Sequence, residues 1–265
     1  MKIYALVIIY NKRCEDSSSI KAIQKYGKGI QVVVFDNSER KLDNNDYCIQ
    51  YGYQYISQGE NVGLSKAYNC AINHIIHEDD DYLITLDDDT ELTKEYFEEL
   101  EILCGENRYD VILPVIRSSG IILSPSNLVN GCHSRTVNDI AELNQETITA
   151  INSGAVIRMG LYKKIQYNEA LFLDYVDHDF MKKAHRNNAK FKVMRSTIKQ
   201  HYSRHEKMPL EKALKRFDVE TADFRTFCKE AGKIGFYRVY MIKLVSQLTL
   251  KYKSPLFIRR TILGK

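Results

Sequence analysis

The stretch Tyr82-Leu83-Ile84-Thr85-Leu86-Asp87-Asp88-Asp89 ends an apolar run in three consecutive carboxylates. A short run of aliphatic and β-branched residues is typical of a buried strand, and open α/β sheets bind ligands beyond the carboxyl ends of such strands. Carboxylates there are hard oxygen ligands, and a Mg²⁺ or Mn²⁺ ion held by them keeps coordination sites for the oxygens of a diphosphate. The alternative is an acidic cap on the following helix, because Asp and Thr are both common N-caps.

On both sides of this strand the chain alternates strand-like and helix-like segments. Strands are expected at 3–10, 31–36, 53–56, 82–87 and 110–115, and helices at 16–27, 63–77 and 93–104. Their near-continuous apolar character predicts a doubly wound, mostly parallel α/β sheet with helices on both faces. Residues 117–149 are rich in Ser, Asn and Gly and are expected to form loops and irregular strands. A strand at 155–157, helices at 160–165 and 177–188, and a strand at 191–195 complete the pattern.

The composition fits a folded α/β protein. The 265 residues are 44% hydrophobic, enough for one large domain or one domain with an appendage. The six cysteines form no C-x-x-C pair, so neither a zinc site nor a redox motif is expected, and a reduced, cytoplasmic protein is favoured. The apolar residues 1–10 are too few to cross a membrane and are expected to be the first buried strand.

Charge is distributed unevenly along the chain. The net charge is +4 at pH 7, yet residues 231–265 contain eight Lys or Arg and no Asp or Glu, which leaves −4 for residues 1–230. This favours a basic C-terminal segment with its own role over a nucleic-acid-binding body. Apolar and basic residues are interspersed in 233–265, a pattern suited to an anionic membrane surface. Packing of its apolar face on the domain, or on a second subunit as a homodimer, explains the pattern equally well.

Two polar stretches at predicted strand ends are candidate ligand sites. Asp36-Asn37-Ser38 ends the strand 31–36, where polar residues also serve simply to turn the chain. Asn61-Val62-Gly63 runs into the helix 63–77, whose first N–H groups favour anions, and Lys66 adds a positive charge. An ordinary capped helix explains the second stretch as well.

A second acidic cluster lies at 171–180. Asp174, Asp177 and Asp179 fall within six positions, together with His178 and between aromatic residues. Burial of several carboxylates costs free energy and needs a reason, and one of them is a candidate general base. Alternatively, Asp177 and Asp179 stabilise the N-terminal dipole of the helix that they begin.

Two further segments have both a functional and a structural interpretation. The small residues Asn152-Ser153-Gly154 precede a strand, where they either let a substrate approach the backbone closely or form a plain turn. His201 and His205 follow the strand 191–195 and are either metal ligands or structural side chains.

Six segments together resemble the inverting GT-A glycosyltransferases of family two, especially the bacterial rhamnosyltransferase-like branch. The resemblance covers residues 1–205, with the segments in the order that the family shows. They are 7–11 (VIIYN), 34–38 (VFDNS), 60–69 (ENVGLSKAYN), 86–90 (LDDDT), 152–154 (NSG) and 172–180 (FLDYVDHDF). Val176-Asp177 stands where many relatives have Glu-Asp.

The resemblance implies a role for each segment. The residues implied to bind a nucleotide are Tyr10, Asn11, Asp36, Asn37, Asn61, Gly63, Lys66, Asp87 and Asp88. Those implied to bind the acceptor are Ser153, Gly154 and Asp174, and the implied ligands of Mg²⁺ or Mn²⁺ are Asp89 and His201. The cation would neutralise the leaving diphosphate. Asp177 would deprotonate the acceptor hydroxyl in a single inverting displacement, and Asp179 is the rival base.

The resemblance also implies an organisation and a set of partners. Residues 1–115 would be the nucleotide-sugar-binding half, 116–205 the acceptor-binding and catalytic half of the same domain, and 206–265 a basic amphipathic helical extension. The donor would be dTDP-rhamnose or a UDP-hexose, and the acceptor a lipid-linked glycan of a bacterial surface polysaccharide. The enzyme would be cytoplasmic and peripheral on the inner face of the membrane.

Two other classes of protein were weighed against this one. The triplet is similar to the D-x-D-x-[TV] signature of haloacid-dehalogenase-type phosphatases, but it lies far from the N-terminus and Glu91 occupies the Thr/Val position. A non-catalytic nucleotide-sugar-binding or scaffold protein is the other alternative, since a fold alone does not establish turnover.

Overall fold

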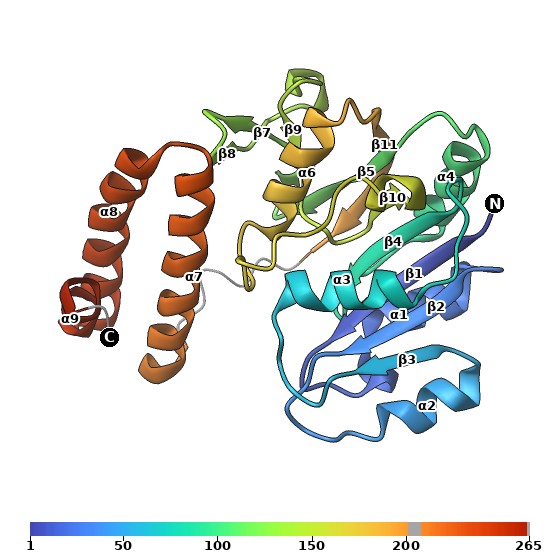
Figure 1. Ribbon diagram of the computed structural model, residues 1–265, viewed down its shortest axis with the longest axis horizontal. Helices are drawn as coiled ribbons and strands as arrows, with labels where there is room; N and C mark the ends of the chain where they lie inside the picture. Colours follow the sequence, from blue (N-terminus) through green and yellow to red (C-terminus); the bar gives the residue numbers. More distant parts are fainter. Residues whose placement is uncertain (201–207, 264–265) are drawn as a thin grey trace.

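A computed structural model of the chain describes residues 1–200 and 208–263. Its main feature is an eight-stranded sheet in the order β11-β5-β10-β4-β1-β2-β3, with β6 paired to β5 (Figure 1). Within the described residues, the antiparallel strands of this sheet are β10, which opposes both β4 and β5, and β6, which opposes β5. The mostly parallel sheet expected from the sequence is therefore confirmed. The strands are β1 (Ile3–Ile9), β2 (Gln31–Asp36), β3 (Gln54–Ser57), β4 (Tyr82–Asp87), β5 (Val111–Ser118), β6 (Ile121–Ser124), β10 (Ala155–Arg158) and β11 (Phe191–Lys199).

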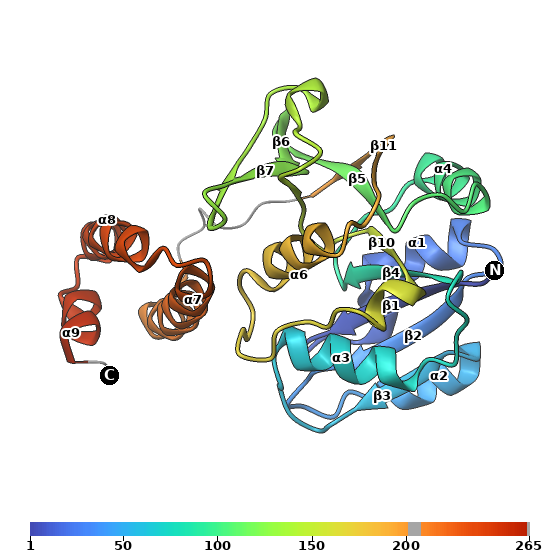
Figure 2. The same cartoon turned by 45° about the horizontal axis from the view of Figure 1, so that its top comes forward.

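Helices cover both faces of this sheet (Figure 2). In β1, Leu6 and Ile8 face a core that includes Tyr68 of α3 and Phe180 of α6, whereas Val7 faces the opposite core with α1 and α4. Burial on both faces explains why the strands read as continuous apolar runs. The helices around the sheet are α1 (Ser18–Tyr26), α2 (Asn44–Tyr51), α3 (Leu64–His74), α4 (Lys94–Gly105), α5 (Met159–Tyr162) and α6 (Val176–Arg186), with a short 3₁₀ turn η1 (Cys14–Asp16).

Two regions are more regular than the sequence predicts. Helix α2 was not expected, because its eight residues show little amphipathic pattern and its N-cap Asp43 makes no capping hydrogen bond through its side chain. Residues 117–149, expected to be loops and irregular strands, form the end of β5, then β6 and a small sheet in the order β8-β7-β9. These short elements are β7 (Ser126–Val129), β8 (His133–Arg135), η2 (Ile140–Glu142) and β9 (Ile148–Thr149).

Three helices follow the sheet domain: α7 (Leu210–Glu230), α8 (Ile234–Tyr252) and α9 (Leu256–Leu263). They pack on one another around Phe217, Met241 and Phe257. Figures 1 and 2 show α8 and α9 on the far side of α7 from the sheet. Phe224 and Phe227 of α7 belong to the core that underlies α3 and α6, so α7 joins the two parts. Within the described ranges, no helix is long and apolar enough to cross a membrane.

A close backbone contact fixes the start of α3. Gly63, its N-cap, has φ +82° and ψ 165°, a conformation that essentially only glycine adopts. A Cβ atom built on Gly63 would lie 2.7 Å from the carbonyl oxygen of Phe172 and 2.6 Å from its ring. The amide of Leu64 donates a 2.6 Å hydrogen bond to that same carbonyl. The turn before α3 and the loop before α6 therefore touch through backbone atoms.

We expect Gly63→Ala to destabilise the protein by about 2–3 kcal/mol, because it adds backbone strain and forces a backbone contact apart. Gly52→Ala is the matched control, since Gly52 also has a positive φ of 68° but open space around its Cα. We expect it to cost about 1 kcal/mol. Equilibrium urea unfolding measures both, and equal losses would show that the contact with Phe172 is not a constraint.

Candidate functional site

The candidate site lies at the carboxyl edge of β1, β2 and β4. These strands are parallel, with Ile9 beside Asp36 and Ile8 beside Asp87, so the segments that follow them emerge together. The amide of Asn11 donates to Ser38 Oγ at 2.7 Å, and Asn37 Nδ2 donates to Asn61 Oδ1 at 3.0 Å. Three of the stretches expected to bind a nucleotide are thus joined directly.

The polar side chains after β2 also hold these loops in place. Asp36 is 3% exposed and accepts hydrogen bonds from Asn44 Nδ2 at 2.8 Å and Tyr55 Oη at 3.1 Å. Asn37 Oδ1 accepts from the amide of Val62 at 2.8 Å. Residues 36–38 therefore turn the chain, as the structural interpretation expected, and this turn does not conflict with a ligand site at the same edge. Asn44, in the unexpected helix α2, supports this edge and was missed.

Two groups at this edge face outward or lack a partner. The ring of Tyr10 is 48% exposed. The Oδ1 atom of Asn11 is buried and has no hydrogen-bond partner among the residues that the structure describes. Lys66 is exposed on α3, one turn beyond Gly63. Tyr10 and Lys66 are therefore exposed, whereas Asn11 Oδ1 is a buried acceptor whose hydrogen-bonding capacity is unused.

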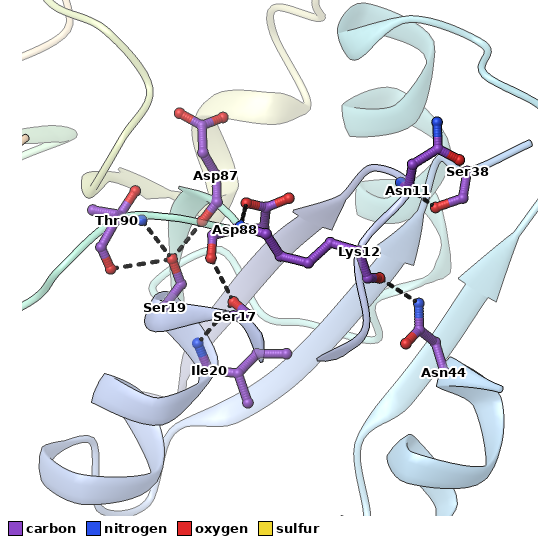
Figure 3. Close-up of polar contacts among 10 residues, drawn as sticks. All are labelled: Asn11, Lys12, Ser17, Ser19, Ile20, Ser38, Asn44, Asp87, Asp88 and Thr90. Atoms are coloured by element: carbon purple, nitrogen blue, oxygen red, sulfur yellow. Dashed lines mark hydrogen bonds and ion pairs between the residues drawn. The ribbon is translucent and has the colours of Figure 1, made fainter. Parts of the chain in front are cut away.

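The acidic triplet does not cap helix α4. Its N-cap is Thr93, whose side chain accepts from the amide of Tyr96 at 3.3 Å. The triplet is held instead by the start of α1 (Figure 3). Ser17 Oγ donates to the carbonyl of Asp88 at 2.8 Å, and Ser19 Oγ accepts from the amide of Thr90 at 3.0 Å. No sequence signal pointed to these two serines.

The three carboxylates of the triplet differ in their surroundings. Asp88 forms an ion pair with Lys12, a cation of this site that the sequence reading missed. Figure 3 shows the Asp87 carboxylate pointing away from that pair. Asp89 is exposed, and its carboxylate makes no hydrogen bond or ion pair with any residue in the described ranges. It is the carboxylate of the triplet that is open to a cation.

A cavity of about 190 Å³ opens beside Asp87. Ser153 Oγ donates a hydrogen bond to Asp87 Oδ2. Burial raises the pKa of Asp87 to about 6 against the opposing effect of this hydrogen bond, and the charges of Asp89, Asp88 and Asp177 add to the rise. The cavity is lined by Leu64, Tyr68, Asp87, Ile151, Asn152, Ser153, Leu173, Val176, Asp177 and Gln200.

The two carboxylates at the start of α6 lie in different environments. Asp177 lines the cavity, and its Oδ1 accepts from the amide of His178 at 2.7 Å. Asp179 is 1% exposed and forms ion pairs with Lys183 at 2.9 Å and Lys182 at 3.6 Å. Both residues also stand in the first turn of the helix, as the dipole interpretation requires. Only Asp177 shares the cavity with Asp87.

Tyr68 is a cavity residue that the sequence did not single out. It is fully buried beside Asn152, and burial, together with the charges of Asp87 and Asp177, raises the pKa of Tyr68 well above its usual value. Its hydroxyl is therefore a neutral group in the cavity that Asp87 and Asp177 also line. The sequence signal that could have identified Tyr68 was its position in 60–69, one of the six segments that resemble the family.

Two other expected site residues, Gly154 and Asp174, have structural surroundings. Gly154 has φ +81°, and a Cβ there would lie 2.8 Å from Ile198 Cδ1, so its small size serves close packing beside the cavity residue Ser153. Asp174 forms an ion pair with Arg216 of α7. His201 lies outside the described residues.

A divalent cation fits the chemistry of the Asp87–Asp89 turn without a complete protein ligand set. In the described part of the chain, no group of three His, Cys, Asp or Glu lies close enough to hold a metal ion. Mg²⁺ is commonly bound by one or two carboxylates plus waters and substrate phosphates. Asp87 is half-buried beside other carboxylates, and its raised pKa reflects an unfavourable negative charge that a bound cation would offset.

Solved structures with a similar fold include complexes with a nucleotide or a nucleotide sugar. S. aureus TarS 1–349 in complex with UDP-GlcNAc has a TM-score of 0.54 at 18% identity, covering 84% of this chain and 66% of that one. GalNAc-T7 with UDP, GalNAc and Mn²⁺ has a TM-score of 0.62 at 12% identity, covering 95% and 58%. The strand order, the carboxylate-lined edge and these likenesses define a GT-A fold.

Sequence comparisons narrow this class to a family. The profile described as Glycosyl transferase family 2 matches residues 5–166, and the chain belongs to that family. The family expected from the six segments is confirmed.

Two curated relatives share part of their length with the chain. The low-salt glycan biosynthesis hexosyltransferase Agl10 of Haloferax volcanii is 27% identical over 192 residues, which cover 69% of this chain and 62% of Agl10. The dTDP-rhamnosyl transferase RfbF of Shigella flexneri is 22% identical over 182 residues, covering 67% and 61%. The chain therefore matches about three fifths of the length of either relative.

The raised pKa of Asp87 predicts a pH-dependent gain in stability from Asp87→Asn. The carboxyl of the folded protein titrates near pH 6, whereas that of the unfolded chain titrates near its usual value of about 4. As the pH rises from about 4 to 6, the Asp87 carboxyl loses its proton more readily in the unfolded chain than in the folded protein. The unfolding free energy of the wild type therefore falls over this range. Without divalent cations or nucleotide, we expect Asp87→Asn to match the wild type below about pH 4 and to exceed its unfolding free energy by about 1–3 kcal/mol above pH 7.

Urea unfolding across pH 4–8 measures this difference. Asp80→Asn is the control, since Asp80 is exposed on the turn before β4 and should change little at any pH. If the unfolding free energies of Asp87→Asn and the wild type differed by the same amount at every pH in that range, the raised pKa of Asp87 would be contradicted.

Proposed function

We propose that the protein is an inverting glycosyltransferase that moves a sugar from a nucleotide-diphosphate donor to a hydroxyl of a glycan acceptor. The observation that carries this proposal is one cavity, at the carboxyl edge of the sheet, that is lined by both Asp87 and Asp177. Asp87 ends β4 beside the nucleotide-binding loops, and Asp177 comes from the α6 side, so a donor and an acceptor can meet between them. Membership of glycosyl transferase family 2 supports the same reaction.

In the proposed mechanism, Asp177 accepts the proton of the acceptor hydroxyl. The hydroxyl oxygen then forms a bond to the anomeric carbon while the bond from that carbon to the diphosphate oxygen breaks. The nucleoside diphosphate leaves with the electron pair, and a single displacement inverts the anomeric configuration. Asp179 is a poorer base in this arrangement, because it is buried and paired with two lysines.

The nucleotide would occupy the edge formed by Tyr10, Asn11 and the residues after β2. The unpartnered Oδ1 of Asn11 and the exposed ring of Tyr10 suit a base, and Asp87 lies where a ribose would follow. The N-terminus of α3, with Gly63 and Lys66, favours the phosphates. Asp89 would hold Mg²⁺ or Mn²⁺, which neutralises the charge that develops on the diphosphate. Ser153, Gly154 and Asp174 would border the acceptor.

The relatives suggest the class of donor. RfbF is named a dTDP-rhamnosyl transferase, and the TarS fragment was solved with UDP-GlcNAc. We therefore propose a dTDP- or UDP-linked hexose as donor and a lipid-linked glycan of a bacterial surface polysaccharide as acceptor. A non-catalytic nucleotide-sugar-binding protein is the second candidate, and turnover separates the two.

A combined binding and turnover experiment tests the proposal. We expect UDP or dTDP, but not both equally, to raise the melting temperature in the presence of Mn²⁺, by about 5 °C at a ligand concentration of about 100 Kd. Asp89→Ala should lose the Mn²⁺-dependent part of the shift. Asp177→Asn should keep the shift and lower release of the nucleoside diphosphate during transfer by about 10²–10⁴-fold.

Asp179→Asn is the matched control for the base. It should lower the melting temperature, because it breaks a buried ion pair, while retaining most of the transfer rate. Wild-type turnover in Asp177→Asn would refute the role of that residue. Nucleotide binding without transfer to any glycan tested would favour the non-catalytic candidate.

We further propose that α8 and α9 lie on an anionic membrane surface. The exposed apolar side chains of α8 include Val239 at 68%, Ile242 at 71% and Leu250 at 78%, and Ile262 of α9 is 74% exposed. Exposed basic residues flank them at Arg238, Lys243, Lys251, Lys253 and Arg259. Exposed apolar side chains interspersed with positive charges suit an anionic lipid surface. A homodimer formed through the same face is the alternative.

Sedimentation with vesicles tests the membrane role. We expect the protein to bind vesicles that contain about 30% anionic lipid, to bind neutral vesicles weakly, and to be released by 0.5 M salt, at roughly 1 kcal/mol per basic residue. The double variant Ile242→Ser, Leu250→Ser should lose binding, whereas Ile102→Ser, which removes an apolar side chain of α4 that is 65% exposed, should not. The homodimer would be favoured if the wild type were a dimer, the double variant were a monomer, and neither bound vesicles.

A further inference from the structure

A single buried carboxylate of α7 holds the loop that leads into α6. Asp223 is 3% exposed, and its two oxygens accept three backbone amides: Phe172 at 2.9 Å, Leu173 at 2.8 Å and Asp174 at 2.8 Å. Hydrogen bonds to an ionised acceptor are roughly twice as strong as neutral ones. Three consecutive amides on one carboxylate fix the path of the backbone through this loop.

The same loop has two further attachments to α7. The guanidinium of Arg216 forms a two-pronged ion pair with Asp174. The ring of Tyr175 stacks on Phe224 and Phe227, with centroid distances of 4.8 and 5.1 Å. Tyr175 has φ +63° and is the N-cap of α6. Its left-handed backbone is therefore supported from the α7 side, two residues before Asp177.

The other side of the loop forms part of the cavity wall. The carbonyl of Phe172 accepts the amide of Leu64, and both Leu64 and Leu173 line the cavity. The loop is thus held between α7 and the N-terminus of α3. A shift of its backbone would move Leu173 and the first turn of α6, which carries Asp177.

We infer that Asp223 is a positioning residue of the reaction and that α7 supports the active site through the loop before α6. The family profile ends at residue 166, so nothing in the family match assigns a role to this helix. Asp223 fixes the backbone of Phe172, Leu173 and Asp174, and thereby the place of Asp177 relative to the donor. This inference rests on the proposed glycosyl transfer. The residues that influence the reaction would then include one from the C-terminal helices, in addition to those of the sheet domain.

A purely structural role would be to attach α7 to the sheet domain, and kinetics separate the two roles. Attachment alone changes stability and leaves turnover per folded molecule unchanged. Positioning changes kcat much more than the affinity for the nucleotide, because most of the proposed nucleotide contacts come from the β1, β2 and β4 edge and not from the loop before α6. The relevant variant is Asp223→Asn, which keeps the side-chain shape but removes the charge and leaves one amide facing an N–H group.

The test compares Asp223→Asn with Asp218→Asn, assayed well below the melting temperature of both. Asp218 lies on the same helix but pairs with Arg260 of α9, away from the loop. We expect Asp223→Asn to lower kcat by about 10- to 100-fold, since misplacement of reacting groups by about 1 Å has effects of this size. The Kd of the nucleotide with Mn²⁺ should stay within about threefold. Amide hydrogen exchange should accelerate at residues 172–174, and Asp218→Asn should match the wild type in all three measurements.

Arg216→Gln provides a second variant that leaves the buried carboxylate intact. It removes a partly exposed attachment of the same loop and should lower kcat in the same direction by a smaller factor. A kcat within twofold of wild type in Asp223→Asn, with Asp177→Asn inactive, would overturn the inference and leave the proposed function standing. Absence of transfer by the wild-type protein would remove the proposed function, and this role with it.

Discussion

The parallel register of β1, β2 and β4 is the constraint on which the rest of the site depends. Because Ile8 pairs with Asp87 and Ile9 with Asp36, three strands end at one edge and their polar continuations must share a small volume. Burial of both sheet faces keeps these strands from shifting, since a slip would expose apolar side chains or bury polar ones. The hydrogen bonds among Asn11, Ser38, Asn37 and Asn61 then join loops that the strands have already brought together.

The positions of the strands and the polar residues at their ends could be predicted from the sequence. Two-sided burial requires continuous apolar runs, and the residues that end those runs must be polar, so Asp36 and Asp87 stand out at their positions. The order of six such segments also identified the family. The choice between Asp177 and Asp179 was not readable, because it depends on which side chain turns toward the cavity and which meets Lys182 and Lys183.

Other parts of the site come from contacts between distant segments, which a single sequence does not show. Lys12 reaches Asp88 across 76 residues, and Ser17 and Ser19 hold the acidic turn from the start of α1. Helix α2 was missed because its pattern is weakly amphipathic, yet its Asn44 supports Asp36. Asp223 lies in a helix beyond the family match and acts on a loop about 50 residues earlier. These contacts required the fold before they could be seen.

The reversed direction of β10 bears on how such a protein diversifies. β5 ends at the carboxyl edge of the sheet, and β10, running against it, begins at that same edge. Residues 119–154 therefore form an excursion at this edge, in which β6 stays paired with β5 and β7 to β9 form the separate small sheet. An insertion or exchange within this excursion leaves both strand ends in place. This excursion can consequently evolve in length and composition while the edge formed by β1, β2 and β4 stays unchanged.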